Sequence, residues 1–185
     1  VYGIGLIVTN ATPLGGYVEQ YTNVSNGKFL GINYLIWIAI IVAAITWFIF
    51  NMTRHGKYMY AIGGNPQAAE VAGVPVKATL ILIYMKAAAM YGLAGFMLGA
   101  KAGGASVQTG YGYEMEAIAA CTIGGVSVTG GRGKVSSAII GVAVFELLKA
   151  ALQYLGVDAN AQYIAIGIVI FVAISLDIRK YVAKK

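Results

Sequence analysis

The chain has 185 residues, of which 59% are hydrophobic and only 11% are charged, and it contains 25 glycines. Its mean hydropathy of +0.75 excludes an ordinary water-soluble domain, so we expect an integral membrane protein in contact with lipid. The formal charge of +6 does not indicate nucleic acid, because the basic residues cluster beside apolar runs without an aromatic and basic groove. The single cysteine, Cys121, excludes an internal disulfide and a cysteine-rich metal site.

The first third of the chain predicts an apolar end, a polar loop and a complete span. The sequence opens in the middle of an apolar run, so residues 1–8 are expected to end a preceding span of a longer polypeptide. Residues 9–33 are rich in Asn, Gly, Thr and Tyr, which predicts an irregular periplasmic loop. Residues 34–50 carry no charge and have Tyr34 and Trp47 near their ends, as in a transmembrane helix.

Residues 51–77 form a long polar segment between apolar runs, and their basic residues predict that the segment is cytoplasmic. Gly63 and Gly64 are expected to break the chain, with Gly64 in the turn. A helix over 67–72 then follows, because Asn65 is a good N-cap residue and Pro66 suits the first helical position. Gly73 is expected to end this helix.

Two interpretations of this capped helix are open. It is either a well-ordered connection between two spans or a docking helix for a cytoplasmic partner. In the second case we expect Ala68, Ala69 and Ala72 to permit close approach, while Gln67 and Glu70 offer polar contacts.

Residues 78–100 predict a second complete span with glycines for close helix packing, and residues 101–113 a polar stretch outside the membrane. Residues 114–131 are short and consist largely of small residues, with Gly124–Gly125 and Gly130–Gly131. We expect a broken span that lines a pathway, because interrupted backbone at membrane depth needs protein or a cavity around it. An ordinary helix whose small residues serve packing is the alternative.

Residues 135–155 and 161–177 predict two further spans, followed by a basic cytoplasmic tail at 178–185. Three basic clusters then fall on one side of the membrane, which agrees with the number of crossings. The expected fold is therefore an all-α polytopic membrane bundle with one broken or re-entrant span and a short cytoplasmic helix.

Three charges fall within the predicted spans: Lys86, Glu146 and Lys149. Charges at membrane depth are usually paired, turned inward or functional, so we expect Lys86 to face protein or a water-filled cavity. Glu146 and Lys149 lie one helical turn apart and are expected to neutralise one another.

No catalytic, cofactor or metal site is predicted. The run GGRGK lacks both ends of a phosphate-binding loop. Ser127 in an apolar setting has no general base within reach, because the single histidine, His55, lies in the polar segment. Metal ligands at usable spacing are also missing.

Two long motifs carry a family resemblance. The stretch KYMYAIGGNPQAAEVAGV, followed by GYEMEAIAACTIGGVSVTGGRG, resembles the permease subunit of bacterial ABC importers for monosaccharides, the ribose, xylose and galactose family. The ending QYIAIGIVIFVAISLDIRKYVAKK favours the galactose/methyl-galactoside branch. Members of this family are about twice as long, so the chain resembles their C-terminal half.

The resemblance implies a multi-pass protein of the bacterial inner membrane with a cytoplasmic C-terminus and no enzymatic activity of its own. Its implied partners are a cytoplasmic ABC ATPase, a periplasmic or lipid-anchored sugar-binding protein, a second permease copy and a small-molecule sugar. The residues implied to couple to the ATPase are Gly63, Gly64, Asn65, Pro66, Gln67, Ala68, Ala69, Glu70 and Gly73. The sequence departs from the family pattern at Lys86, Glu116, Glu146 and Lys149.

The motif at 113–133 is implied to border the translocation pathway. A neutral sugar needs hydroxyl, amide and aromatic groups along its path, and the candidates are Gln108, Thr109, Tyr111, Tyr113, Glu114, Thr122, Ser127 and Thr129. Alternatives are a permease for another sugar or a nucleoside, an ion-coupled secondary transporter, and a membrane anchor subunit that transports nothing.

Overall fold

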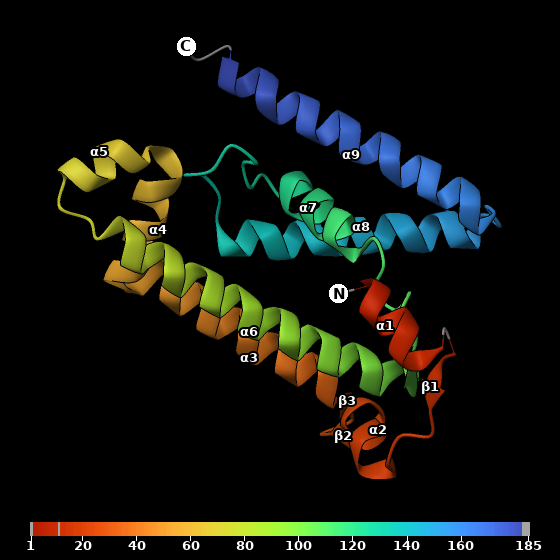
Figure 1. Ribbon diagram of the computed structural model, residues 1–185. Coiled ribbons are helices and arrows are strands. Elements are labelled where there is room, and N and C mark those ends of the chain that lie inside the picture. Colours follow the sequence, from red (N-terminus) through yellow and green to blue (C-terminus); the bar gives the residue numbers. More distant parts are fainter. Residues whose placement is uncertain (1, 11, 183–185) are drawn as a thin grey trace. The chain divides into compact units, whose positions relative to one another are not determined.

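The computed structural model describes residues 2–10 and 12–182 (Figure 1). In chain order the elements are α1 (Tyr2–Thr9), β1 (Leu14–Gly15), α2 (Glu19–Asn26), β2 (Lys28–Phe29), β3 (Ile32–Asn33), α3 (Tyr34–Met52), α4 (Arg54–Gly64), α5 (Pro66–Val71), α6 (Val76–Ala102), β4 (Gly104–Ala105), α7 (Tyr113–Ile123), α8 (Val135–Tyr154) and α9 (Ala159–Val182). The predictions for residues 1, 11 and 183–185 lie outside the described residues. The chain forms two compact units, Val1–Ala44 with Ile81–Tyr111 and Ile45–Leu80 with Gly112–Lys185.

Within residues 2–10 and 12–182, four helices are long and apolar enough to cross a membrane. They are α3, α6, α8 and the Asn160–Arg179 part of α9, with mean hydropathies between 1.6 and 2.3. Very few of their residues are buried within the chain, so their apolar side chains are left to contact lipid or other protein. The all-α polytopic membrane fold is confirmed, and each of these spans begins and ends within a few residues of its predicted limits apart from the C-terminal end of α9.

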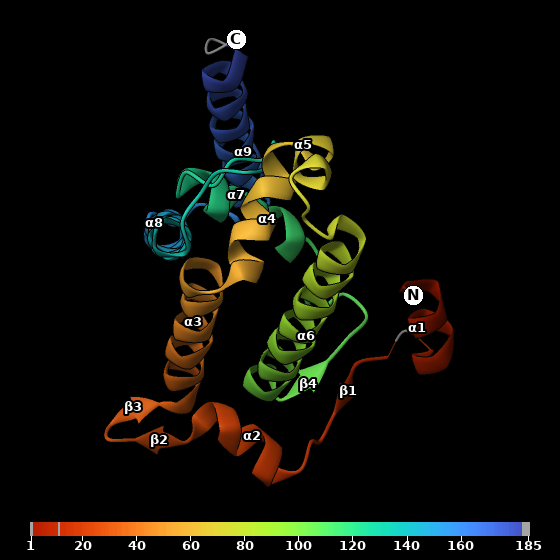
Figure 2. The same ribbon diagram turned by 90° about the vertical axis from the view of Figure 1, so that its left-hand side faces the viewer.

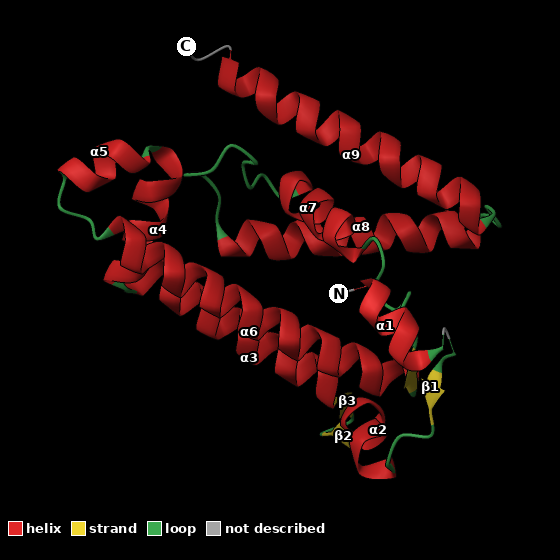
Figure 3. Ribbon diagram, in the orientation of Figure 1, coloured by secondary structure: helices red, strands yellow, loops and turns green. Residues whose placement is uncertain are grey.

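The first unit corrects the prediction of an irregular loop before the first complete span. Residues 9–33 include α2 and the β2–β3 hairpin (Figure 3), and β1 pairs antiparallel with β4. The Tyr21 hydroxyl on α2 donates a hydrogen bond to the Phe96 carbonyl on α6 at 2.7 Å. Gly99 leaves room for this hydroxyl, because a Cβ there would lie 2.5 Å from it. The β1–β4 pairing and the Tyr21–Phe96 bond join residues far apart in the sequence, which explains why local composition did not indicate them. The β2–β3 hairpin, in contrast, is local.

The second unit has its apolar core where α7 lies against α8 and α9. Ala119 and Ala120 of α7, Phe145 of α8 and Ile166 of α9 are all buried. Small residues allow close approach here: a Cβ on Gly141 of α8 would lie 2.1 Å from the Ala120 carbonyl oxygen. Close packing through small residues is the usual basis of helix association in membranes.

Helix α7 is broken off after 11 residues, at Ile123. Gly125 has φ +84°, and the Val126 N–H donates to the Cys121 carbonyl at 2.9 Å, which closes the helix with a Schellman motif. The chain then continues without helix to Lys134, a stretch that we call the glycine-rich segment (124–134). The prediction that residues 114–131 are not one straight transmembrane helix is confirmed, and the alternative of an ordinary helix is wrong.

Helices α8 and α9 are joined by a turn at Gly156. Its φ of +71° lies in the left-handed region, which glycine adopts readily. Asp158 caps the start of α9 by accepting from the Asn160 N–H at 3.0 Å. Helix α9 continues to Val182, so the predicted tail at 178–185 is at first helical.

Candidate functional site

The polar segment after α3 is more ordered than the sequence predicted. It begins with α4, where the Thr53 hydroxyl accepts from the Gly56 N–H at 3.2 Å as an N-cap. Gly63 and Gly64 were expected to break the chain, but they form the last residues of this helix. The break comes one residue later, at Asn65.

Helix α5 is capped at both ends, as predicted. The Asn65 side-chain oxygen accepts from the N–H groups of Gln67 and Ala68 at 3.0 and 3.1 Å. At the other end, Gly73 has φ +82°, and the Val74 N–H donates to the Ala69 carbonyl at 3.0 Å. Such a helix needs little further ordering when it binds a partner.

The exposed face of α5 differs from the prediction at one position. Ala69, expected to face a partner, is only 4% exposed and therefore belongs to the interior of the unit. Val71 is 91% exposed on the same helix. Pro66, Gln67, Ala68 and Glu70 of α5 are also exposed, as are Asn65 before the helix and Ala72 and Gly73 after it. A bulky charge at Ala69 would therefore test folding and not docking.

A contact between backbones joins α4 to the glycine-rich segment. A Cβ on Gly63 would lie 2.6 Å from the Gly131 nitrogen, and a Cβ on Gly130 would lie 2.7 Å from the Gly63 carbonyl oxygen. A Cβ on Gly64 would meet open space. Of the two adjacent glycines, Gly63 and not Gly64 is therefore the one at which an added side chain would collide with other atoms.

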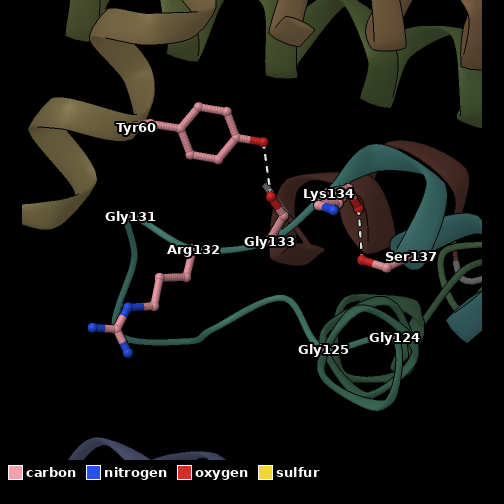
Figure 4. Close-up of a pocket in the computed structure, with 8 residues that line it drawn as sticks. All are labelled: Tyr60, Gly124, Gly125, Gly131, Arg132, Gly133, Lys134 and Ser137. Carbon is pink, nitrogen blue, oxygen red and sulfur yellow. Dashed lines mark hydrogen bonds between the residues drawn. The ribbon is translucent and has the colours of Figure 1, made fainter. Parts of the chain in front are cut away.

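Tyr60 makes a second link between the same two elements. Its hydroxyl donates to the Gly133 carbonyl at 2.8 Å, as Figure 4 shows. A cavity of about 490 Å³ lies beside this bond. It is lined by Tyr60, Gly124, Gly125, Gly131, Arg132, Gly133, Lys134 and Ser137. The Arg132 side chain extends on the side of the segment opposite the Tyr60 ring (Figure 4).

Asp177 of α9 anchors the opposite end of the glycine-rich segment. One carboxylate oxygen accepts from the Ser127 hydroxyl at 2.9 Å and from the Val128 N–H at 3.1 Å. Ser127 and Thr129, both predicted pathway residues, also share a hydrogen bond of 2.8 Å. Sequence reasoning missed Tyr60 and Asp177 because their partners lie 73 and about 50 residues away.

We expect Asp177→Ala to loosen the segment. Loss of a charged acceptor for two donors should lower the free energy of unfolding by about 1 to 3 kcal/mol. Hydrogen exchange at residues 127–130 should accelerate, and Ser127→Ala, which removes one donor only, should show a smaller change. Unchanged exchange in Asp177→Ala would show that other contacts hold the segment.

Two of the three charges predicted within spans, Glu146 and Lys149, form a cluster with Glu116. Lys149 Nζ lies 2.8 Å from Glu116 Oε2 on α7 and 3.6 Å from Glu146 Oε1 on its own helix. The expected neutralisation of Lys149 by Glu146 is therefore the weaker of two interactions. Glu116 could not be assigned as a partner from local spacing, because it lies 33 residues from Lys149.

The remaining pathway candidates lie in both units. In the first unit, Gln108, Thr109 and Tyr111 are exposed on the turns after β4. In the second unit, Tyr113 and Glu114 are exposed in the first turn of α7. Thr122 is buried, and its hydroxyl donates to the Ile118 carbonyl of the same helix at 2.7 Å. Lys86 is half-buried on α6, and its orientation toward protein or water stays a prediction.

Comparison with known proteins decides the family. Residues 2–174 match the family described as the permease component of branched-chain amino acid transport systems. The chain belongs to this permease family. No solved structure matches it.

Several curated permeases are similar over nearly the whole chain. The galactose/methyl galactoside import permease MglC of Haemophilus influenzae is 38% identical over 192 residues, which cover 100% of this chain and 57% of that protein. The corresponding permease of Treponema pallidum is also 38% identical, and 36% of its length is covered. The ribose import permease RbsC of Bacillus subtilis is 36% identical, with 96% of this chain and 56% of that protein covered. This member of the permease family thus spans little more than half of the H. influenzae and B. subtilis relatives.

Proposed function

We propose that the chain is part of the permease subunit of an ATP-driven sugar importer in a bacterial inner membrane. It would form the translocation pathway for a monosaccharide such as galactose or a methyl galactoside. Similarity to proteins named as galactose/methyl galactoside import permeases supports this proposal. The permease would catalyse no covalent step, and a cytoplasmic ATPase, a sugar-binding protein and a second permease copy would complete the transporter.

Helix α5 is the proposed docking site for the ATPase. The observation that carries this assignment is a capped helix that exposes Val71 at its end and is joined by α4 to the glycine-rich segment. Helix α4 carries Arg54 and Lys57, and it contacts the glycine-rich segment, which carries Arg132 and Lys134. Basic clusters that meet in this way support a common cytoplasmic side.

The contacts of the glycine-rich segment suggest how movement would pass from the ATPase to the membrane. Displacement of α5 would move α4, and α4 would carry the segment through Gly63 and Tyr60. The segment runs from α7 to α8 (Figure 2), and Asp177 of α9 accepts hydrogen bonds from it. The pathway helices would therefore rock together when two ATPase subunits close on ATP.

Val71→Glu tests the proposal in the complete transporter. Burial of a valine at an interface contributes about 1.5 to 3 kcal/mol, so the variant should bind the ATPase at least about tenfold more weakly. Proteoliposomes containing wild-type permease, ATPase and binding protein should take up labelled galactose only with ATP, and Val71→Glu should lose this uptake. Leu155→Glu, at an exposed turn away from α5, should still copurify with the ATPase.

Two outcomes separate the parts of this proposal. Wild-type uptake that follows a proton or sodium gradient, or no uptake of any sugar, would contradict the importer function. Normal ATPase binding by Val71→Glu would contradict the docking site while leaving the importer function intact.

A further inference from the structure

Glu116, Lys149 and Glu146 carry a net charge of −1 within one small cluster. Lys149 is held closely by Glu116 at 2.8 Å, and the 3.6 Å separation from Glu146 is longer than a hydrogen bond. The Glu146 side chain is 61% exposed, compared with 20% for Glu116 and 28% for Lys149. Glu146 thus presents a carboxylate on the outer surface of the α7–α8 pair.

The position of Glu146 along α8 places this carboxylate at membrane depth. It is the twelfth of 20 residues in the helix, so it lies about 12 Å along the axis from the last residue at the usual helical rise. A charge on a transmembrane helix almost always faces the interior of the bundle or a water-filled cavity. We therefore expect protein or water, and not lipid, around the Glu146 carboxylate.

Helix α7 begins at about the same depth. Glu116 in its first turn pairs with Lys149, and Gly124 after its last turn lies against Ser137 near the start of α8. The first residue of α7 is therefore level with Lys149, about 8 Å short of the end of α8. The chain before it is not helical, since Gly112 has φ +84°. Non-helical backbone at this depth is tolerated where protein surrounds it or where it lines a water-filled cavity.

We propose that Glu146, supported by Lys149 and Glu116, lines a water-filled part of the solute pathway and binds hydroxyl groups of a neutral polyhydroxyl solute. The Glu146 carboxylate would accept hydrogen bonds from hydroxyls, and the Lys149 ammonium would donate to a hydroxyl oxygen. Such charge-assisted hydrogen bonds are stronger than those between neutral groups. The ligand class rests on the proposed function, whereas the water-filled environment rests on the positions of the charges.

Cysteine accessibility in the complete transporter tests the inference. In a Cys121→Ser background, Glu146→Cys should react with a charged, membrane-impermeant methanethiosulfonate added to proteoliposomes. Leu147→Cys is the matched control, because Leu147 is 69% exposed but points about 100° away around the helix. It should react with a membrane-permeant maleimide and stay unlabelled by the charged reagent. Galactose should slow labelling of Glu146→Cys if wild-type protein takes up galactose.

A second variant makes the test independent of whether the cysteine variants fold. Glu146→Gln should still assemble with the ATPase and raise the half-saturating sugar concentration for uptake by about tenfold, because one charge-assisted acceptor is lost. Labelling of Glu146→Cys no faster than that of Leu147→Cys, or oxidative cross-linking of Glu146→Cys between two copies, would overturn the proposal. Labelling that sugar does not slow, in a transporter whose wild type takes up that sugar, would overturn the solute contact.

Discussion

Replacing Lys149 by methionine should produce a clear loss of stability in the second unit. The substitution leaves Glu116 and Glu146 with no cation close by at membrane depth. Breaking a fully buried ion pair from one side costs roughly 3 to 5 kcal/mol. This cluster is partly exposed, so the expected loss is smaller, about 1 to 3 kcal/mol. The thermal unfolding midpoint of the purified permease in detergent would measure it.

The second-site variant Glu116→Gln distinguishes charge from packing. If uncompensated charge causes the loss, Lys149→Met combined with Glu116→Gln should recover most of the wild-type midpoint, because only the more exposed Glu146 stays charged. Lys149→Arg, which keeps the cation, should be nearly as stable as wild type. A double variant as unstable as Lys149→Met alone would mean that the alkyl chain of Lys149 matters more than its charge.

Replacing Gly63 by alanine should abolish ATP-driven uptake, whereas the same change at Gly64 should be tolerated. The added Cβ at Gly63 would lie 2.6 Å from a backbone nitrogen of the glycine-rich segment. Overpacking of this kind typically costs about 1 to 3 kcal/mol, and here it would separate the two elements that are proposed to move together. Uptake and sugar-stimulated ATP hydrolysis in proteoliposomes would measure both consequences.

Gly64→Ala is a close control, since it changes the neighbouring residue by the same methyl group into open space. It should leave uptake unchanged, with a stability equal to or slightly above wild type because alanine favours helix. If Gly63→Ala hydrolyses ATP and transports sugar normally, the contact between α4 and the segment has no part in coupling.

The features that the sequence predicted correctly are encoded locally. The four long apolar helices follow from residue composition, the caps of α5 from Asn65, Pro66 and Gly73, and the break after α7 from Gly124–Gly125. Each signal lies within a few residues of the structure that it determines, because capping and chain reversal depend on backbone groups close by.

The features that were missed depend on contacts between distant residues. Nothing near Lys149 indicates that Glu116 is its partner, and nothing near Ala69 indicates that it is buried while Val71 is exposed. Helix α4 was missed for another reason: its polar, glycine-containing sequence has a weak helical preference, and the Thr53 cap and the contacts with the glycine-rich segment support it. Site residues of this kind can be identified only once the fold is known.

The joint between Gly63 and Gly130–Gly131 has a genetic consequence. Glycine is the smallest residue, so every missense change at any of these three positions adds side-chain atoms to this contact. A clash caused by one such change therefore cannot be relieved by a smaller residue at either of the other two positions. A damaging change at Gly63 therefore has no compensating substitution at its direct contacts. Revertants of a Gly63 variant should restore glycine at Gly63 or change the backbone conformation of the glycine-rich segment. Substitutions at Gly130 or Gly131 should hardly ever restore function.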